Sequence, residues 1–278
     1  MVQTVEDVSI VLPVFNDEAT LVEALESALM QVGPTSVIYC LNDASTDGSS
    51  RILEEYAARY PSRFQLYHNT VNQGSTKKSI YWNRPEIPGR YFCFLGSDDY
   101  WITPDKLAKQ VAFLDANPSY IGCSCDTLVR NEETGETSFI KSDRRDWSIM
   151  DLLRWRRRYG LYVHTSSIVW RNLYLEDGFF LPAAFEGGYG HGDVVLMHMM
   201  MARGGLMHNI PEVMSCYRYT GRGVWSQKSV KEQKRIQRVV RRNVFMSVPL
   251  KYKLANAVHM LFLYAKPVRT LIPGPLND

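Results

Sequence analysis

The first part of the chain alternates between apolar runs and polar turns. The apolar runs contain many β-branched and aromatic residues, as expected for strands buried on both faces of a sheet. They lie at residues 8–15, 36–41, 64–67 and 91–95. Apolar positions recur at helical spacing in three other segments. The first begins near residue 18, the second begins near residue 49, and the third covers residues 105–116.

Strand, polar turn and helix follow one another repeatedly, which predicts an α/β fold with a mostly parallel sheet and helices on both faces. In such sheets ligands bind beyond the carboxyl ends of the strands. The polar turns after Phe15, Leu41 and Leu95 all fall on that edge. We therefore expect a ligand site there.

The turn after residue 95 carries two adjacent carboxylates, Asp98 and Asp99. Neighbouring negative charges repel and are tolerated best beside a cation or several hydrogen-bond donors. The chain has no GxGxxG and no GxxxxGK[ST] motif, so a phosphate ligand would need a metal ion or basic side chains. One or two aspartates can hold Mg²⁺ or Mn²⁺ while phosphate oxygens fill other positions. The alternative is a polar turn that caps the following helix.

The composition is that of a globular protein: 278 residues, 45% hydrophobic and 22% charged. Five Cys, an odd number with no CxxC pair, indicate buried free thiols in a reducing cytoplasm rather than a zinc site. The N-terminus lacks the basic region of a secretory signal. Residues 226–278 hold 11 Lys and Arg and 2 Asp and Glu, out of 32 and 29 in the chain, so an acidic body precedes a basic tail.

Five segments in order resemble those of family 2 glycosyltransferases, and together they extend over about residues 5–226. The segments are LPVFNDE, LNDASTDGS, NQGSTKK, LGSDDYW with PDKL behind it, and YRYTGRGVWS. The resemblance implies the GT-A fold, a nucleotide-sugar donor and inversion of anomeric configuration.

The resemblance also implies a set of donor-binding residues, with Asp99 as the direct ligand of a metal ion. Asp43 is expected to hydrogen-bond the nucleobase or ribose, and Arg218 or Arg222 to approach the diphosphate. The full set of donor-site residues is Pro13, Phe15, Glu18, Asp43, Lys77, Lys78, Asp98, Arg218 and Arg222.

The acceptor side is expected in the second half of the domain. Asp193 stands where the family carries an acidic pair, and the resemblance implies that it is the catalytic base, with Glu186 as the substitute. The alternative is that Asp193 caps the Met-rich helix that follows.

The tail predicts a second region, 226–278, after a catalytic domain at 1–225. Residues 226–243 favour a basic helix, and the apolar residues 254–265 are too few for the ~20 that span a bilayer. A basic segment followed by an amphipathic one fits an anionic membrane surface. The alternative is a tail packed on the catalytic domain. Nucleic-acid binding is not expected, because the body is acidic.

We therefore expect a metal-dependent inverting glycosyltransferase of hexosyl or N-acetylhexosaminyl type, using Mn²⁺ or Mg²⁺ and a nucleotide-sugar, with a UDP-sugar as first choice. Its acceptor would be a glycan or a polyprenyl-linked glycan of bacterial surface polysaccharide synthesis, at the inner face of the membrane. Two other classes stay open. One is a nucleotidyltransferase with a similar sheet. The other is a non-catalytic nucleotide or glycan binder, because Gly96, Gly192 and Thr220 depart from the family pattern.

Overall fold

The computed structural model of the protein describes residues 6–73, 87–142, 144–155, 163–175, 192–221, 228–247, 249–250 and 252. The described helices are α1 (Glu18–Leu29), α2 (Ser49–Arg59), α3 (Lys106–Ala116), α4 (Ile149–Trp155), α5 (Gly192–Ala202) and α6 (Val230–Ser247), with 3-10 turns η1 (Thr165–Ser167) and η2 (Leu173–Leu175).

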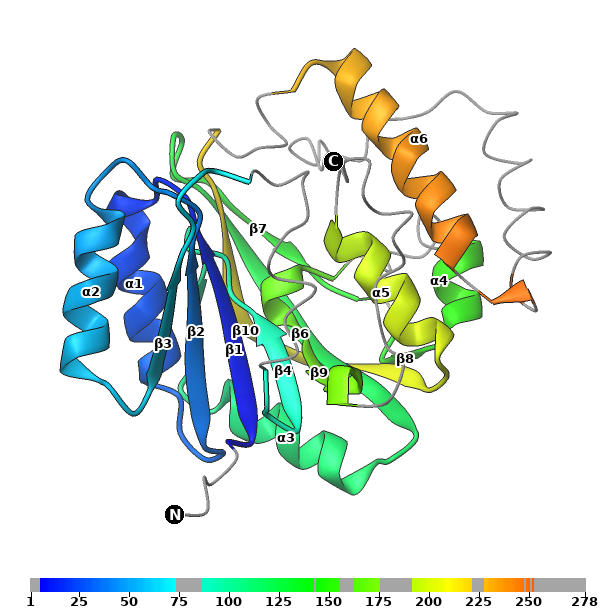
Figure 1. The fold of residues 1–278 in the computed structure, drawn as a ribbon. Helices are drawn as coiled ribbons and strands as arrows, with labels where there is room; N and C mark the ends of the chain where they lie inside the picture. Colours follow the sequence, from blue (N-terminus) through cyan, green and yellow to red (C-terminus); the bar gives the residue numbers. More distant parts are fainter. Residues whose placement is uncertain are drawn as a thin grey trace.

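The strands form one 10-stranded sheet of order β3-β2-β1-β4-β9-β6-β10-β5, with β7 beside β6 and β8 beside β10 (Figure 1). Their bounds are β1 (Val8–Val14), β2 (Ser36–Asn42), β3 (Phe64–His68), β4 (Tyr91–Phe94), β5 (Tyr100–Trp101), β6 (Tyr120–Asn131), β7 (Thr137–Ile140), β8 (Asp146–Trp147), β9 (Val169–Arg171) and β10 (Leu206–Tyr219).

The N-terminal half of the sheet is parallel, as the alternation of strands and helices predicts. β1 pairs in parallel with β2 and β4, and β2 pairs in parallel with β3. The four strands and three helices expected in this half are all present, so the predicted α/β architecture is confirmed.

The second half of the sheet adds strands that the apolar pattern did not reveal. β9 runs antiparallel to both β4 and β6, whereas β10 is parallel to β6 along its whole length. Register shifts interrupt the β10–β6 pairing between Ile210 and Ser215, around Pro211. A proline cannot donate to the ladder and is tolerated in strands at such irregularities. Beyond them β10 also pairs with β5, beside the carboxyl end of β4.

Two hydrophobic cores lie on opposite faces of the sheet. Alternate residues of β1, from Val8 to Val14, pack with α1, α2 and α3 in one core. Val11 belongs to the other core, which contains α4, α5 and part of α6. Successive strand residues point to opposite faces, so a strand covered by helices on both sides must be apolar throughout. This arrangement explains why β1 is apolar at every position except Ser9.

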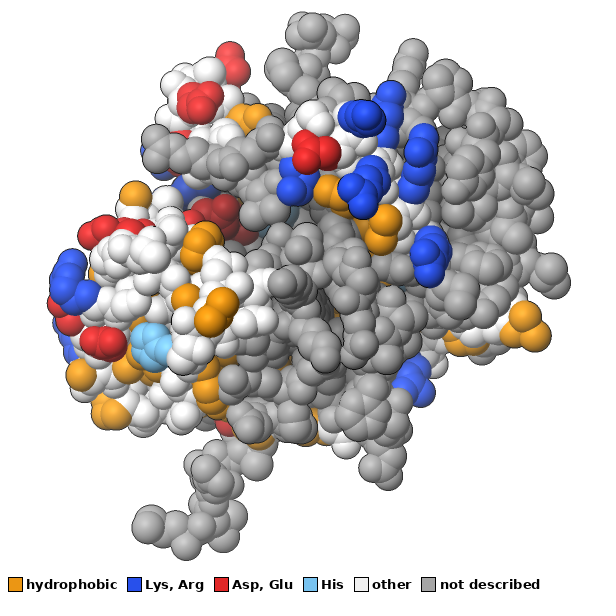
Figure 2. All heavy atoms as spheres, turned by 45° about the horizontal axis from the view of Figure 1, so that its top comes forward, with side chains coloured by type: hydrophobic (Ala, Val, Ile, Leu, Met, Phe, Trp, Pro, Cys, Tyr) orange, Lys and Arg blue, Asp and Glu red, His pale blue; other side chains and the backbone are white. Residues whose placement is uncertain are grey.

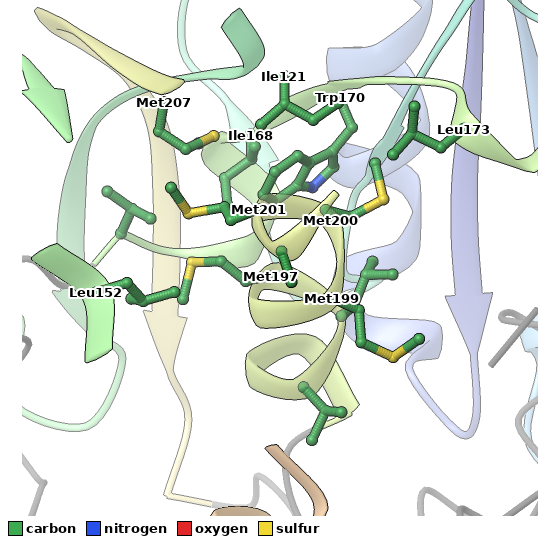
Figure 3. Close-up of a cluster of buried hydrophobic side chains, with 14 of the residues drawn as sticks. Ile121, Leu152, Ile168, Trp170, Leu173, Met197, Met199, Met200, Met201 and Met207 are labelled. Atoms are coloured by element: carbon green, nitrogen blue, oxygen red, sulfur yellow. The ribbon is translucent and has the colours of Figure 1, made fainter. Parts of the chain in front are cut away.

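The second core is rich in methionine (Figure 3). Met197, Met199, Met200 and Met201 of α5 are buried among side chains that include Trp170 of β9. Methionine is flexible and fills irregular space. It suits the junction between a mixed sheet and three helices.

The basic segment forms α6, whose inner face packs into the same core. Val240 and Val244 are buried there, and Ile236 lies against them. None of the described helices has the length and apolar content needed to cross a membrane. All five cysteines are buried and free, as expected.

Candidate active site at the carboxyl edge of the sheet

The loops after β1, β2 and β4 meet at the carboxyl edge of the parallel strands, where a ligand site was expected. The loops after β1 and β2 are tied together by hydrogen bonds. Asn16 N donates to Ser45 Oγ at 3.1 Å, and Asn16 Oδ1 accepts from Thr46 N at 2.7 Å. Glu18 Oε2 accepts from Gly48 N at 2.9 Å. In the structure the Glu18 carboxylate therefore links these two loops. Its predicted contact with the ligand stays a prediction.

Both loops contain a non-glycine residue in the left-handed backbone region. Asn16 has φ 56° and Ala44 has φ 57°. This conformation costs an alanine roughly 1–2 kcal/mol, and such residues cluster at functional sites. The cross-loop hydrogen bonds hold the strained backbone in place.

Asp43, the expected nucleoside contact, lies buried at the end of β2. Its Oδ1 accepts hydrogen bonds from Asn69 Nδ2 at 2.7 Å and from Gln73 N at 2.9 Å. The preceding Asn42 donates from Nδ2 to Ser50 Oγ at 2.7 Å and accepts from Ser45 N. The Asn42 side chain thus both donates and accepts hydrogen bonds at the end of β2.

Pro13 and Phe15 stand at the end of β1. Pro13 is half-buried, while the Phe15 ring is 44% exposed. An exposed aromatic ring at this edge offers an apolar surface to a ligand.

Asp98 and Asp99 lie with their carboxylates on the same side of the loop after β4. A Cβ added to Gly96 would lie 2.8 Å from Asp98 Oδ1 and 3.0 Å from Asp99 Oδ2. A side chain at position 96 would therefore displace at least one carboxylate. Gly96, a departure from the family pattern, is what this arrangement requires.

Asp99 is held by three neighbours. Ser166 Oγ of η1 donates to Oδ2 at 2.6 Å, and Arg218 N of β10 donates to Oδ1 at 3.3 Å. His164 Nδ1 lies 3.7 Å from Oδ2. Each oxygen retains a second lone pair, so the carboxylate is oriented and still able to bind a cation.

Asp17 is a third carboxylate of this cluster, and the sequence analysis did not single it out. Its Oδ2 accepts from Ser97 Oγ at 2.5 Å. Burial raises the pKa of Asp17, and the nearby Asp47 raises it further. The available signal was its position after β1, on the same sheet edge as the acidic turn after β4.

Burial and repulsion perturb the two adjacent aspartates strongly. Burial, followed by the charges of Asp99 and Asp17, raises the pKa of Asp98 to about 7. Burial also raises the pKa of Asp99 to about 7, against the lowering effect of the Ser166 and Arg218 hydrogen bonds. Three acidic groups with little compensating charge favour a bound cation.

The donor set fits Mg²⁺ or Mn²⁺ shared with a phosphate ligand. Within the part of the chain that the structure describes, no group of three or more His, Cys, Asp or Glu residues is arranged to hold a metal ion. Mg²⁺ is commonly bound through one or two carboxylates and completed by water and phosphate oxygens. Asp98 and Asp99 match that mode.

The Arg218 guanidinium is buried rather than open to the edge. It contacts the Glu23 carboxylate, lies 3.8 Å from Glu132 Oε1, and has its carbon 4.8 Å from the centre of the Tyr100 ring. Its observed contact with the acidic cluster is made by the backbone N–H. Binding of phosphate by the guanidinium stays a prediction.

Several expected site residues lie outside the described residues. These are Lys77, Lys78, Glu186 and Arg222. Asp193 belongs to the first turn of α5, which begins at Gly192, but its side chain is not described. Its role as base stays a prediction.

A family model described as glycosyl transferase family 2 matches residues 9–174, more than half of the chain. The chain belongs to glycosyltransferase family 2. One relative of this glycosyltransferase is an uncharacterized protein of Mycobacterium tuberculosis, 33% identical over 225 residues that cover 78% of this chain and 60% of that protein. The chain thus spans about three-fifths of that relative.

Solved structures of other transferases share the fold of this glycosyltransferase. One is S. aureus TarS 1–349 in complex with UDP-GlcNAc, with a TM-score of 0.65, 17% identity, and coverage of 92% of this chain and 71% of that one. Another is the mannosyltransferase PcManGT from Pyrobaculum calidifontis in complex with GDP-Man and Mn²⁺, with a TM-score of 0.58, 17% identity, and coverage of 96% and 77%. These likenesses identify the GT-A fold.

The raised pKa values predict a pH-dependent stability in the absence of metal. Between the usual value of 3.8 and about 7, the folded state binds more protons at Asp98 than the unfolded state does. Stability therefore falls as pH rises through this window. An asparagine side chain at this position stays neutral, so the Asp98→Asn variant does not lose stability in this way. In EDTA, the melting temperature of the variant minus that of the wild type should therefore increase from pH 4.5 to pH 7.5. A constant difference across that range would contradict the raised pKa.

Proposed function

We propose that this glycosyltransferase moves a hexosyl or N-acetylhexosaminyl group from a nucleotide diphosphate to an acceptor hydroxyl, with inversion. The observation that carries the proposal is the cluster of Asp17, Asp98 and Asp99 at the carboxyl edge of the parallel strands. Support for a nucleotide-sugar comes from the donors bound in the two transferases of the same fold, with UDP-GlcNAc favouring a UDP-sugar.

The proposed roles of the site residues follow from their positions. Asp99, oriented by Ser166 and Arg218 N, would hold the metal ion together with Asp98. A divalent cation there supplies Lewis-acid stabilisation of the negative charge that develops on the departing diphosphate. Pro13, Phe15 and Asp43 would receive the nucleoside, because they surround the ends of β1 and β2.

The acceptor hydroxyl is a poor nucleophile at neutral pH, so a carboxylate must accept its proton as the new bond forms. Asp193, in the first turn of α5, is the proposed base. A single displacement by a hydroxyl on the opposite face of the sugar gives inversion. The proposed acceptor is a glycan or a polyprenyl-linked glycan of bacterial surface polysaccharide synthesis, in the cytoplasm at the inner face of the membrane.

Two other functions, a nucleotidyltransferase and a non-catalytic binder, can be distinguished from a glycosyltransferase by their products. A nucleotidyltransferase would release diphosphate from a nucleoside triphosphate and would need no acceptor-side base. A non-catalytic binder would bind the nucleotide without turnover. Gly96 leaves room for both carboxylates of the pair, which supports a role for the pair in binding a cation.

The proposal predicts a metal-dependent thermal shift. UDP, GDP, dTDP and CMP would each be tested with and without Mn²⁺. A ligand at about 100 times its Kd stabilises by about 2.7 kcal/mol, which raises the melting temperature by about 5–10 °C. We expect one nucleoside diphosphate to give this shift only with Mn²⁺, and Asp98→Asn to abolish it.

Asp146→Asn is the matched control, because Asp146 is an exposed residue whose pairing with His208 contributes little. Equal shifts with and without Mn²⁺ would reject the metal site. Flat curves for all four nucleotides would reject the proposed donor class.

Asp193→Asn is expected to lower turnover by roughly 10²- to 10⁴-fold, the usual range for loss of a general base. Donor binding, measured by the same thermal shift, should be unchanged because the acceptor side is separate from the nucleotide. The measurement is release of nucleoside diphosphate in the presence of acceptor. Full turnover in the variant would move the role to another residue, with Glu186 the first to test.

Peripheral membrane contact is supported by the outer face of α6. Figure 2 shows Lys and Arg side chains gathered at the upper right, where Figure 1 has α6. The exposed cations of this helix are Lys231, Lys234, Arg235, Arg238 and Arg242. Because Val240 and Val244 fix the opposite face in the core, this basic face is held outward.

Lys234→Glu with Arg238→Glu should weaken co-sedimentation with phosphatidylglycerol vesicles by on the order of tenfold or more, since each cation near an anionic surface contributes about 1 kcal/mol. Binding to phosphatidylcholine vesicles should be weak for all variants. Arg51→Glu with Arg59→Glu makes the same charge change on α2 and serves as the control. Equal binding by both double variants would argue against α6 as the contact.

A further inference from the structure

Lys106, the first residue of α3, is a lysine in the interior of the protein. Its side chain is 0% exposed, and no carboxylate lies within ion-pair distance of it among the residues that the structure describes. Lysine is almost never fully buried without a partner. The proposed mechanism does not use Lys106, so its position calls for another explanation.

Within the part of the chain that the structure describes, Gln110 and Trp101 lie beside the ammonium group, and both can stabilise a cation. Nζ donates a hydrogen bond to Gln110 Oε1 at 2.7 Å and lies 4.5 Å from the centre of the Trp101 ring. A desolvated ammonium over an indole face is among the stronger cation–π arrangements. The contact with Oε1 also decides which way the Gln110 amide faces: its oxygen points to the ammonium and its NH₂ points away.

Both neighbours of Lys106 bind the backbone of the same turn, η1. Gln110 Nε2 donates to Ser167 O at 2.9 Å and to Cys123 O at 2.7 Å. Trp101 Nε1 donates to Ser166 O at 2.8 Å. One buried cation thus fixes two donors that hold adjacent carbonyl groups of η1.

This turn in turn orients Asp99. Ser166 Oγ accepts a hydrogen bond from Gly96 N at 3.2 Å and lies 2.6 Å from Asp99 Oδ2. Since the hydroxyl has a single proton and its lone pair faces Gly96 N, that proton is directed to Asp99. Every link from Lys106 to the carboxylate is a hydrogen bond or a ring contact between residues that are at most 3% exposed.

We propose that Lys106 is a positioning residue for the metal site, acting through Gln110 and Trp101 on η1, and through Ser166 on the Asp99 carboxylate. The inference rests on the proposed function, because a cation at Asp99 is what the orientation serves. Among the contacts of the described residues, Lys106 has no hydrogen bond or ion pair with Asp98 or Asp99, so it would act on the site through its neighbours. A purely structural lysine would affect stability alone, whereas a positioning lysine also affects metal affinity in the folded protein.

The test compares Lys106→Met with Lys109→Met. Met is unbranched and one atom shorter than Lys, so it keeps most of the side chain and removes the charge. Lys109 lies on the outer surface of the same helix, paired with Asp105 and Glu212. Protein-bound Mn²⁺ would be measured by water-proton relaxation enhancement in the presence of UDP. Loss of a supporting contact around metal ligands usually weakens metal binding 10- to 100-fold. We expect a loss of that size in Lys106→Met and none in Lys109→Met.

Two further variants make the result specific. Trp101→Phe removes the indole N–H that binds Ser166 O but keeps an aromatic ring. It should also weaken Mn²⁺ binding, and it tests the same route to Asp99 if Lys106→Met does not fold. Ser166→Ala breaks the last link. If Lys106 acts through Ser166, the double variant Lys106→Met/Ser166→Ala should bind Mn²⁺ no more weakly than the weaker single variant.

The outcomes that overturn the inference are distinct from those that overturn the function. Wild-type affinity in folded Lys106→Met or Trp101→Phe, or losses that multiply in the double variant, would reject the positioning role alone. Absence of protein-bound Mn²⁺ in the wild-type protein would reject both the metal site and this inference.

Discussion

Like charges that are buried side by side repel one another, and this protein holds Asp17, Asp98 and Asp99 together at one edge of its sheet. Burial raises the pKa of all three carboxyl groups, and the charges of neighbouring aspartates add to this effect. Without a counter-charge such a cluster destabilises the folded state near neutral pH. The surrounding loops, turns and strands are arranged to keep the carboxylates in place despite that repulsion.

The rigidity of this edge comes from hydrogen bonds between segments far apart in the chain. The loops after β1 and β2 fasten to each other through Asn16 and Glu18, which supports the left-handed backbone at Asn16 and Ala44. The loop after β4 is fastened from the other side by Ser166 and by the backbone of Arg218. An orientation set before a ligand arrives does not have to be established during the reaction.

The second half of the sheet supports the acidic cluster and carries the helices of the second core. β9 and β10 add antiparallel and parallel pairings to β6, and the part of β10 beyond its register shifts places Arg218 N beside Asp99. Behind these strands, the methionines of α5 and the inner face of α6 complete one continuous core. The basic helix is therefore attached to the catalytic fold through its apolar face, while its cations remain outside.

The sequence by itself determined the parallel half of the sheet and the edge on which the site lies. The apolar runs of β1, β2 and β4 are local patterns, and the polar residues that follow a strand must lie at its carboxyl end. Asp98 and Asp99 could be singled out in this way. The sequence did not reveal β9 and β10 as parts of the same sheet, because their pairings join distant segments and their polarity is mixed.

Only the tertiary structure decided which groups surround the carboxylates. It placed Asp17 beside the pair, gave Gly96 a steric reason, and buried the Arg218 guanidinium against acidic side chains. It also placed Lys106 in the interior, a position that the sequence analysis did not single out. Hydrogen bonds and burial of this kind depend on contacts between residues separated by tens of positions along the chain, and no local pattern of residue types encodes them.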